Sequence, residues 1–379
     1  MATLMNVAIA TARKLRIPVK ERQIPNSINF DAITEVHEVT YLATGGFNSV
    51  WLIKLCHPLH IPPQSMEDIN IDPQADTVRE FVLRLPYKDA LLPNQITNDV
   101  AFKQFIARKL PHIPVPRVYL YHATDEADSS FTVEEYIDCP PLSSTWMSLT
   151  QAQKQNMGQT LAQILVDLAE VQFDMIGGLD PITHSPAPTV EYCKISKGRE
   201  QFHRNDCYPI GPYKSTKEYI LGCYDREIYY YTHATEKEIG LYLFNSAILE
   251  NFTEGLKQKR AALAATDIVD EPFVLVHGDF HGLNILARGD QVAAIIDFDL
   301  AGSYPLSEVL AGGPIAVLAC AGDESYEEMR IWDEKIRGLV RHETEKRGWD
   351  RSEIDLLMRN NHNTVVEGSC GDASVFQLT

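Results

Sequence analysis

Residues 276–299 read VHGDFHGLNILARGDQVAAIIDFD and place acids, amides and histidines between apolar runs. The runs NIL (284–286) and VAAII (292–296), separated by the turn ARGD, predict a hairpin of two strands. Such a hairpin would bring Asp297, after its second strand, back beside Asn284. Polar groups are costly in a buried setting unless something pairs with them. The stretch is therefore either the polar tip of a surface hairpin or a reaction centre built on two strands.

The residue types in this stretch favour the reaction centre. Asn284 and Asp297 offer an amide and a carboxylate oxygen, which are hard ligands that suit Mg²⁺. Asp279 could remain off the metal and accept a proton from an alcohol. The order His277-x-Asp279, then Asn284, then an aspartate after a hairpin is the catalytic arrangement of protein-kinase-like phosphotransferases. A bare D-x-x-x-x-N is common by chance, but the longer string in its strand context is specific.

The composition sets the class of protein. The chain has 379 residues, is 45% hydrophobic and carries a formal charge of −18, so it can build a sizeable core and is a poor candidate for binding nucleic acid. It contains no apolar run long enough to span a membrane. Seven scattered cysteines without a CxxC pair fit a reducing compartment and favour the cytoplasm. The basic, acid-free first twenty residues form either an ordinary amphipathic helix, which we favour, or a mitochondrial presequence.

The pattern of elements changes along the chain. Residues before about 136 are rich in strands with one helix, whereas helices dominate afterwards, apart from the hairpin. Strands are predicted over 80–86, over 131–137 and within 39–55, where two strands are joined by a glycine turn. A helix is predicted over 98–110, with Asn98 as its N-cap. A second helix is predicted after Thr150, which forms a capping box with Gln153.

The chain resembles the aminoglycoside phosphotransferase family, especially its fungal members, over most of its length. The segments that carry the resemblance are HGDFHGLNIL (277–286), IIDFDLAG (295–302), LATGGFNSVW (42–51), FVLRLP (81–86), IPVPRVY (113–119), FTVEEYI (131–137), FDMIGGL (173–179) and GPYKSTKEYI (211–220). The resemblance implies a two-lobed, protein-kinase-like α+β fold. A small mixed lobe with an antiparallel sheet (1–136) would bind the nucleotide, and a larger, mainly helical lobe (137–379) would hold the catalytic and acceptor sites. The reaction would transfer the γ-phosphoryl group of ATP to a hydroxyl of a small molecule.

The resemblance also assigns roles to single residues. Asp279 would orient the acceptor hydroxyl and take its proton, while Asn284 and Asp297 would hold Mg²⁺. Arg84 stands where the family has a cation that contacts the α- and β-phosphates, and Asp99 where a helix acid pairs with that cation. The remaining contacts to ATP would come from Gly45, Gly46, Phe47 and Asn48 over the phosphates, and from backbone groups near Glu135 and Ile137 at the adenine.

Several departures from the family pattern support an alternative without catalysis. Arg84 replaces the lysine of many kinases, although it keeps the charge and can fork onto phosphate. Asp99 is shorter than the usual glutamate, and the glycine turn is sparse. The alternative is a catalytically silent, kinase-like protein that binds a nucleotide or a partner.

The histidines of the quoted stretch raise a second alternative. His277 and His281 with Asp279 could serve a metal-dependent hydrolase, but the sequence lacks the HxH or HExxH motif of such enzymes. His281 is instead a further candidate for approaching the γ-phosphate. The acceptor is expected to be a small molecule with a hydroxyl group, either a cationic aminoglycoside or an endogenous metabolite, since substrates vary on a shared fold.

Overall fold

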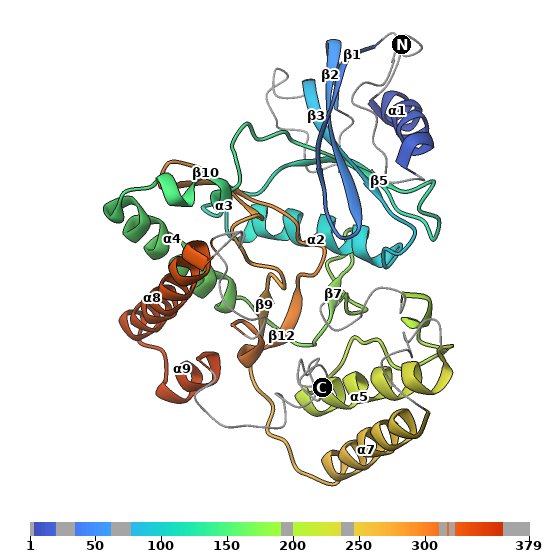
Figure 1. Ribbon diagram of the computed structural model, residues 1–379, viewed down its shortest axis with the longest axis vertical. Coiled ribbons are helices and arrows are strands. Elements are labelled where there is room, and N and C mark those ends of the chain that lie inside the picture. Colours follow the sequence, from blue (N-terminus) through green and yellow to red (C-terminus); the bar gives the residue numbers. More distant parts are fainter. Residues whose placement is uncertain are drawn as a thin grey trace.

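The computed structural model describes residues 4–19, 35–61, 77–190, 200–235, 246–310, 317 and 323–358. Figure 1 shows a sheet with two helices in the upper part and a larger, mainly helical part below it. The predicted α+β class, with an antiparallel sheet first and helices later, is confirmed. The boundary between residues 136 and 137 lies between the last strand of the sheet and the next helix, and stays a prediction.

The first part of the chain forms a five-stranded antiparallel sheet in the order β1-β2-β3-β5-β4. Gly45 closes the β1–β2 hairpin by donating its N–H to the Asn48 carbonyl at 2.8 Å, so the predicted pair of strands joined by a glycine turn is confirmed. The strands are β1 (Val36–Thr44), β2 (Asn48–His60), β3 (Thr77–Pro86), β4 (Val118–His122) and β5 (Phe131–Glu134). The last of these is shorter than the run 131–137 predicted from the sequence.

Helix α1 (Leu4–Val19) packs against this sheet (Figure 1). Its buried apolar residues recur at helical spacing and join one core cluster with the sheet residues Trp51, Phe81 and Phe131. The buried side chains of the helix in that cluster are Leu4, Val7, Ala8, Ala12 and Leu15. The first helix is therefore amphipathic and packs against the sheet, while the compartment of the protein stays a prediction. Among the described helices, none is both long and apolar enough to cross a bilayer.

Replacing Leu15 with alanine is expected to lower the free energy of unfolding by about 2–5 kcal/mol, because the side chain is completely buried against the sheet and its removal leaves a cavity. Urea unfolding measures the change. Arg13→Ala, on the exposed side of the same helix, serves as the control and should leave the unfolding midpoint unchanged. Equal midpoints for Leu15→Ala and the parent protein would mean that α1 is not part of the core.

Helix α2 (Asn94–Lys109) starts earlier than the sequence predicted. Its N-cap residue is Pro93, and Asn98 lies inside the helix, so the prediction that Asn98 caps it is wrong. The buried Asn98 amide instead donates to the carbonyls of Asp299 (3.2 Å) and Ala301 (2.7 Å), and it accepts from the N–H of Leu179 at 3.3 Å. It satisfies backbone groups of two other segments, which fixes the chain after Asp297 against α2.

The rest of the described chain is mainly helical, and its small sheets support the loops of the quoted stretch. The predicted hairpin is confirmed as β10 (Ile285–Arg288) and β11 (Gln291–Ile295), and the capping box of Thr150 and Gln153 is present. The helices are α3 (Leu142–Thr145), α4 (Gln151–Ala169), α5 (Thr216–His233), α7 (Ser246–Ala264), α8 (Asp323–Arg347) and α9 (Arg351–Leu357), with 3₁₀ helices η2 (Trp146–Ser148), η4 (Glu200–Phe202) and η6 (Leu306–Glu308). The other strands are β6 (Gln172–Phe173), β7 (Gly178–Leu179), β8 (Pro186–Ala187), β9 (Phe273–Val276) and β12 (Gly302–Pro305).

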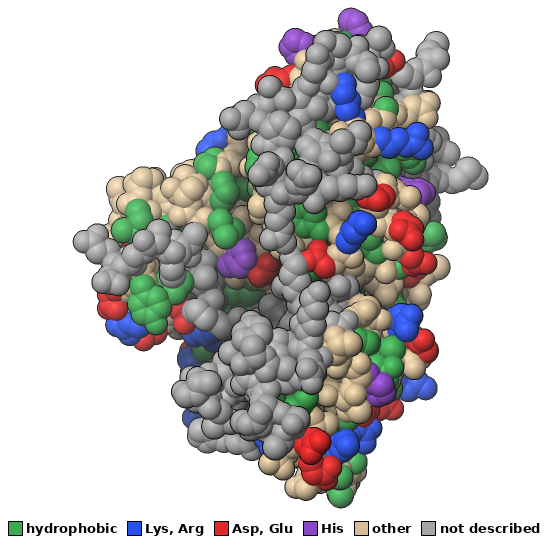
Figure 2. Space-filling view, turned by 45° about the vertical axis from the view of Figure 1, so that its right-hand side comes forward, with side chains coloured by type: hydrophobic (Ala, Val, Ile, Leu, Met, Phe, Trp, Pro, Cys, Tyr) green, Lys and Arg blue, Asp and Glu red, His purple; other side chains and the backbone are tan. Residues whose placement is uncertain are grey.

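The main core of the helical part lies between α4, α5, α8 and the β12-β9-β6 sheet. The indoles of Trp146 and Trp332 meet edge to face in it, with ring centroids 5.2 Å apart. On the face drawn in Figure 2, acidic and basic side chains are interspersed over both parts of the molecule. That nucleic acid is not a partner stays a prediction from the charge.

Candidate active site

Two loops build the site, one between β9 and β10 and the other between β11 and β12. Gly278, in the first loop, has φ +80°, and a Cβ atom there would lie 2.2 Å from the Leu300 carbonyl oxygen in the second loop. Only glycine permits this approach. His277 ties the same loops together, because its Nε2 lies 3.2 Å from the Ile296 carbonyl and its Nδ1 accepts from the N–H of Asp279 at 3.3 Å.

Asp279 is oriented by two neighbours in its own loop. The Asn284 amide donates to Asp279 Oδ2 at 3.0 Å and to its carbonyl oxygen at 3.0 Å. His281 Nε2 lies 3.1 Å from Asp279 Oδ1. About a third of the Asp279 side chain remains exposed, at 34%, so the carboxylate is fixed in direction yet still accessible to a substrate.

The charges in this loop favour an ionised aspartate. Burial works to raise the pKa of Asp279, but the hydrogen bond and charge of His281 outweigh it, so the pKa lies below its ordinary value. The hydrogen bond with Asp279 in turn raises the pKa of His281. Burial lowers the pKa of His277, which fits a neutral ring that donates from Nε2 to the Ile296 carbonyl. Asp279 is thus a carboxylate able to accept a proton.

The pair of His281 and Asp279 predicts a pH-dependent stability. Because the folded-state pKa of His281 is raised, its contribution is fully present below the unfolded value of about 6.5 and is lost as pH rises through the folded pKa. The melting temperature of His281→Gln should therefore fall furthest below that of the parent protein under acidic conditions, and the gap should narrow above neutral pH. Thermal melting across the pH range measures this. A gap that stays constant with pH would refute the charged pair.

Asp297 occupies an unusual backbone conformation, with φ +65°. A non-glycine residue there is uncommon and often marks a functional constraint. The N–H of Ile296 donates to the Asn284 carbonyl at 2.9 Å, so the second strand returns beside Asn284 as the hairpin predicted. Asp297, the next residue, points one oxygen at Arg84, whose guanidinium lies 2.7 Å from its Oδ1.

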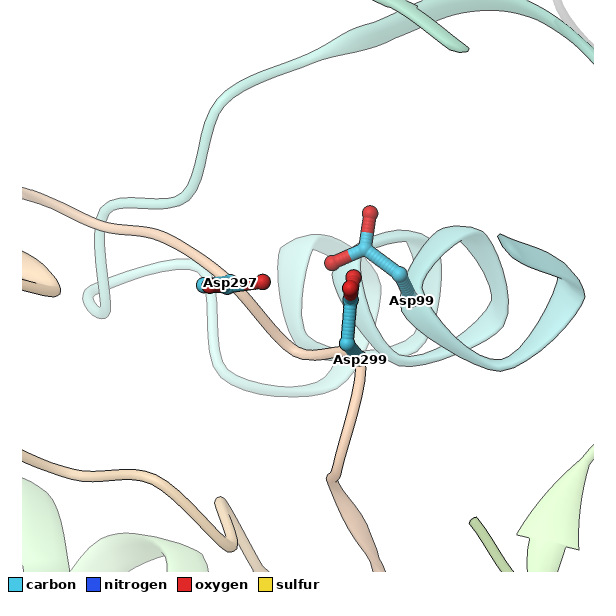
Figure 3. Close-up of side chains that lie close together, drawn as sticks. All are labelled: Asp99, Asp297 and Asp299. Atoms are coloured by element: carbon cyan, nitrogen blue, oxygen red, sulfur yellow. The ribbon is translucent and has the colours of Figure 1, made fainter. Parts of the chain in front are cut away.

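Arg84, on β3, gathers acidic side chains from three other segments. Its NH1 lies 3.1 Å from Asp99 of α2 and 3.6 Å from Glu134 of β5. Its NH2 contacts Asp297 and, at 3.0 Å, Asp299. Figure 3 shows the three aspartates converging, and an oxygen of each lies within 4.8 Å of the others. The ion pair of Arg84 with Asp99 is present; its role toward a nucleotide stays a prediction.

Asp299 was missed as a site residue by sequence reasoning. Its Oδ2 accepts from Asn48 at 3.0 Å and from Gln95 at 2.7 Å, and its Oδ1 accepts from Arg84. Burial raises the pKa of Asp299 well above its ordinary value. These four side chains and Asp99 line one small cavity. Asp299 therefore connects the glycine turn, α2 and β3.

The glycine turn leaves space above the site. A Cβ atom added to Gly46 would meet no other atom within 4 Å, so this part of the turn is open to an approaching group. The Phe47 side chain is buried and its carbonyl accepts from the N–H of Tyr87 at 2.6 Å, so the ring points into the protein. Asn48 faces Asp299. Any contact of Phe47 with a nucleotide would have to come from its backbone N–H.

The segment after β5 keeps two backbone groups available. The N–H of Glu135 donates to the Arg117 carbonyl at 2.8 Å, and its carboxylate accepts from the N–H of Arg117 at 3.1 Å. The Ile137 carbonyl accepts from the N–H of Cys139 at 2.8 Å. Within the described chain, the Glu135 carbonyl and the Ile137 N–H form no hydrogen bond. They are an acceptor and a donor two residues apart, as an adenine edge requires.

The oxygen donors fit a hard divalent cation. Asn284 uses its amide nitrogen toward Asp279, which leaves Oδ1 facing away from that contact, and Asp297 has a second carboxylate oxygen besides the one bound to Arg84. Neither oxygen accepts a hydrogen bond from the described residues. An amide and a carboxylate oxygen are ligands that Mg²⁺ accepts while keeping its waters. Asp99, in contrast, already receives Arg84, Lys103 and the N–H of Phe298.

A comparison with protein-family models decides the family. Residues 74–311 match the model of the phosphotransferase enzyme family, also called APH, and this range includes both loops and the strands β3, β4 and β5, with Arg84 on β3. The chain belongs to the phosphotransferase enzyme family. This confirms the family resemblance drawn from the sequence and the kinase-like fold that it implied, while the likeness to fungal members in particular stays a prediction. Two curated relatives, subtelomeric hrmA-associated cluster proteins of two Aspergillus fumigatus strains, are each 23% identical over 208 residues. That match covers 50% of this phosphotransferase family member but only 36% of each relative.

Solved structures of aminoglycoside phosphotransferases are similar to this family member over most of their length. The structure of APH(4)-Ia has a TM-score of 0.49 at 13% identity, covering 97% of this chain and 96% of that one. A ternary complex of a thermostable APH(4)-Ia mutant with AMP-PNP and hygromycin B has a TM-score of 0.48 at 14% identity, covering 95% of each chain. The streptomycin–ATP–APH(2")-IIa ternary complex has a TM-score of 0.44 at 14% identity, covering 90% and 97%.

Proposed function

We propose that this protein transfers the γ-phosphoryl group of ATP to a hydroxyl group of a small molecule, with Mg²⁺ as the metal. The observation that carries the proposal is the ionised, accessible carboxylate of Asp279, fixed by Asn284 and His281 beside the loop of Asp297. Membership of the phosphotransferase family supports the same chemistry. Positioning and charge neutralisation are the main tasks of a protein in such a transfer.

Asp279 would act on the acceptor. Its carboxylate would accept a hydrogen bond from the hydroxyl and take the proton as the new oxygen–phosphorus bond forms and the bond to ADP breaks. Because the proton leaves late in a loose transition state, a carboxylate with a low pKa is basic enough. His281, paired with Asp279, would hold that carboxylate in place and add positive charge near the transferred group.

Asn284 Oδ1 and the free oxygen of Asp297 would hold the Mg²⁺ ion. When bound, the ion neutralises charge on the phosphate oxygens. Arg84 would exchange some of its contacts with Asp297 and Asp299 for contacts with the phosphates. A planar guanidinium can donate paired hydrogen bonds to a phosphate as well as to a carboxylate. The open turn at Gly46 would let backbone N–H groups approach the phosphates closely.

The segment after β5 would bind the adenine. The Glu135 carbonyl would accept from the exocyclic amino group, and the Ile137 N–H would donate to a ring nitrogen. The acceptor would enter from the exposed side of Asp279, and Figure 2 shows a hollow in the middle of one face with a histidine and acidic side chains at its edge. Acids around an entrance would suit a cationic acceptor such as an aminoglycoside. An endogenous metabolite is the other candidate.

One observation supports a second function, that of a silent nucleotide-binding protein. Arg84 contacts Asp297 and Asp299 at 3.0 Å or less, and a guanidinium that remained there would offset the charge of Asp297 without a metal ion. Such a protein would bind nucleotide without Mg²⁺ and would not consume it.

Phosphate transfer to a panel of aminoglycosides, sugars and amino alcohols tests the proposal. Phosphorus NMR of ATP and Mg²⁺ with the protein should reveal a new phosphate monoester with at least one acceptor, formed together with ADP. Asp279→Asn, added to the same mixtures, should form none. ATP bound but never consumed with any acceptor would favour the silent protein, and turnover without added ATP would favour a hydrolase.

A further inference from the structure

Lys103 is a buried cation to which the proposed reaction gives no task. It lies on α2, one turn after Asp99, and its side chain is 1% exposed. Its Nζ lies 2.8 Å from Asp99 Oδ2 and 2.8 Å from Glu134 Oε2. Burial lowers the pKa of Lys103, but the two carboxylates outweigh it and hold the pKa above its ordinary value. A charge buried at such cost stays only where partners satisfy it.

Lys103 shares both of its partners with Arg84. The guanidinium NH1 of Arg84 lies 3.1 Å from the same Asp99 Oδ2 and 3.6 Å from Glu134 Oε1. The four side chains therefore form a closed ring in which cations and carboxylates alternate. β3 contributes Arg84, α2 contributes Asp99 and Lys103, and β5 contributes Glu134. Thr132 Oγ1 adds a hydrogen bond to Glu134 at 3.0 Å.

This sharing matters because Arg84 has further carboxylates to satisfy. Its NH2 also contacts Asp297 and Asp299. Without Lys103, Arg84 would be the one cation among the described residues within ion-pair distance of these four carboxylates. The excess negative charge would repel a polyphosphate, and the attraction to these carboxylates would hold the guanidinium away from it.

We propose that Lys103 is a positioning residue that neutralises Asp99 and Glu134, so that the charge of Arg84 stays available for the phosphates of the nucleotide. The inference rests on the proposed binding of ATP. It predicts that the charge balance of the ring, rather than its packing, sets the affinity for phosphates. An adenine ring makes no use of Arg84, so adenosine should be indifferent to that balance.

Three variants separate charge from packing. Lys103→Met removes the cation and keeps the length of the side chain, Glu134→Gln removes one carboxylate, and the double variant restores the balance. The Kd of ATP with Mg²⁺ and the Kd of adenosine are measured for each by calorimetry, and their ratio is the readout. We expect Lys103→Met to weaken ATP binding about tenfold relative to adenosine, Glu134→Gln to strengthen it, and the double variant to return within about threefold of the parent protein.

The opposite signs keep the inference open to refutation. An unchanged ratio in Lys103→Met, or a double variant as weak as the single one, would overturn it, because a packing role cannot be rescued by removing a carboxylate. If Lys103→Met does not fold, Glu134→Gln against the double variant makes the same comparison, and equal ratios there would overturn it. A parent protein that binds no ATP at all would instead refute the proposed function.

Discussion

Asp279→Asn is expected to lower the rate of phosphoryl transfer by about 100- to 10,000-fold, the range for loss of a positioned general base. The amide cannot accept the proton of the hydroxyl, yet it keeps the size of the carboxylate and can still accept a hydrogen bond from Asn284. Nucleotide binding should remain, because the Mg²⁺ and phosphate contacts are assigned to other side chains. The rate of monoester formation with the best acceptor, together with the Kd of ATP, measures both effects.

Asp290→Asn is the matched control for this variant. Asp290 lies in the turn of the same β10–β11 hairpin and accepts a hydrogen bond from Asn156, away from the loop of Asp279. Its substitution should leave the transfer rate unchanged. If Asp279→Asn kept the full rate, or if both variants lost it equally, Asp279 would not be the group that acts on the acceptor.

Asp297→Ala is expected to abolish the effect of Mg²⁺ on ATP binding. Asp297 supplies the only charged oxygen that the described residues leave open for the metal beside Asn284. Its loss should weaken ATP binding in Mg²⁺ by more than about 100-fold, because loss of a residue that only supports a metal ligand already costs about 10- to 100-fold. Without Mg²⁺, the variant should bind ATP as well as the parent protein or better, because a carboxylate that repels phosphate is gone. Calorimetric titration with and without Mg²⁺ measures both affinities.

Asp297→Asn separates the metal from the backbone. At φ +65°, alanine is strained, whereas asparagine tolerates this conformation. We expect Asn to lose the Mg²⁺ effect as Ala does but to melt at a higher temperature than Ala. Binding of ATP in Mg²⁺ at the affinity of the parent protein by the Asn variant would contradict the assignment of Asp297 as a metal ligand.

Local patterns in the sequence predicted the part of the site that is local in the chain. The apolar runs 284–286 and 292–296 and the turn between them predicted the hairpin, and the end of a hairpin necessarily lies beside its start. For the same reason the β1–β2 turn and the capping box of Thr150 were predictable from adjacent residues. The position of Asp279 before the hairpin followed from the same short string.

The charge network could not be read in the same way, because its contacts join residues far apart in the chain. Asp299 is 251 positions from Asn48 and 204 from Gln95, and no pattern in either segment specifies the other. Arg84 and Asp99 were paired only through the family resemblance. Lys103 carried one usable signal, since it follows Asp99 by four residues on a helix, but that spacing predicts a surface pair rather than a buried ring.

The helix that contains Asn98 was predicted correctly, but the role of Asn98 as its cap was not. Asparagine before an apolar periodic run is a good helix cap in sequence terms. In the fold, the amide of Asn98 donates hydrogen bonds to the carbonyls of Asp299 and Ala301, which are about 200 residues away in the chain and cannot be predicted from the local sequence. The helix begins earlier, at Asn94. Hydrogen bonding to two buried carbonyls outweighed the preference of asparagine for the N-cap position.

Thermal melting of the parent protein with ATP, with Mg²⁺ and with both shows whether the protein has a site for the nucleotide and the metal ion together. A ligand that binds only the folded state stabilises it by about 2.7 kcal/mol at a concentration of 100 Kd, which is a readily measured rise in melting temperature. The geometry of the site predicts a large rise with ATP and Mg²⁺ together, and little or none with Mg²⁺ alone, because Arg84 already occupies one oxygen of Asp297. No rise with any nucleotide, whether or not Mg²⁺ is present, would mean that the protein has no nucleotide site.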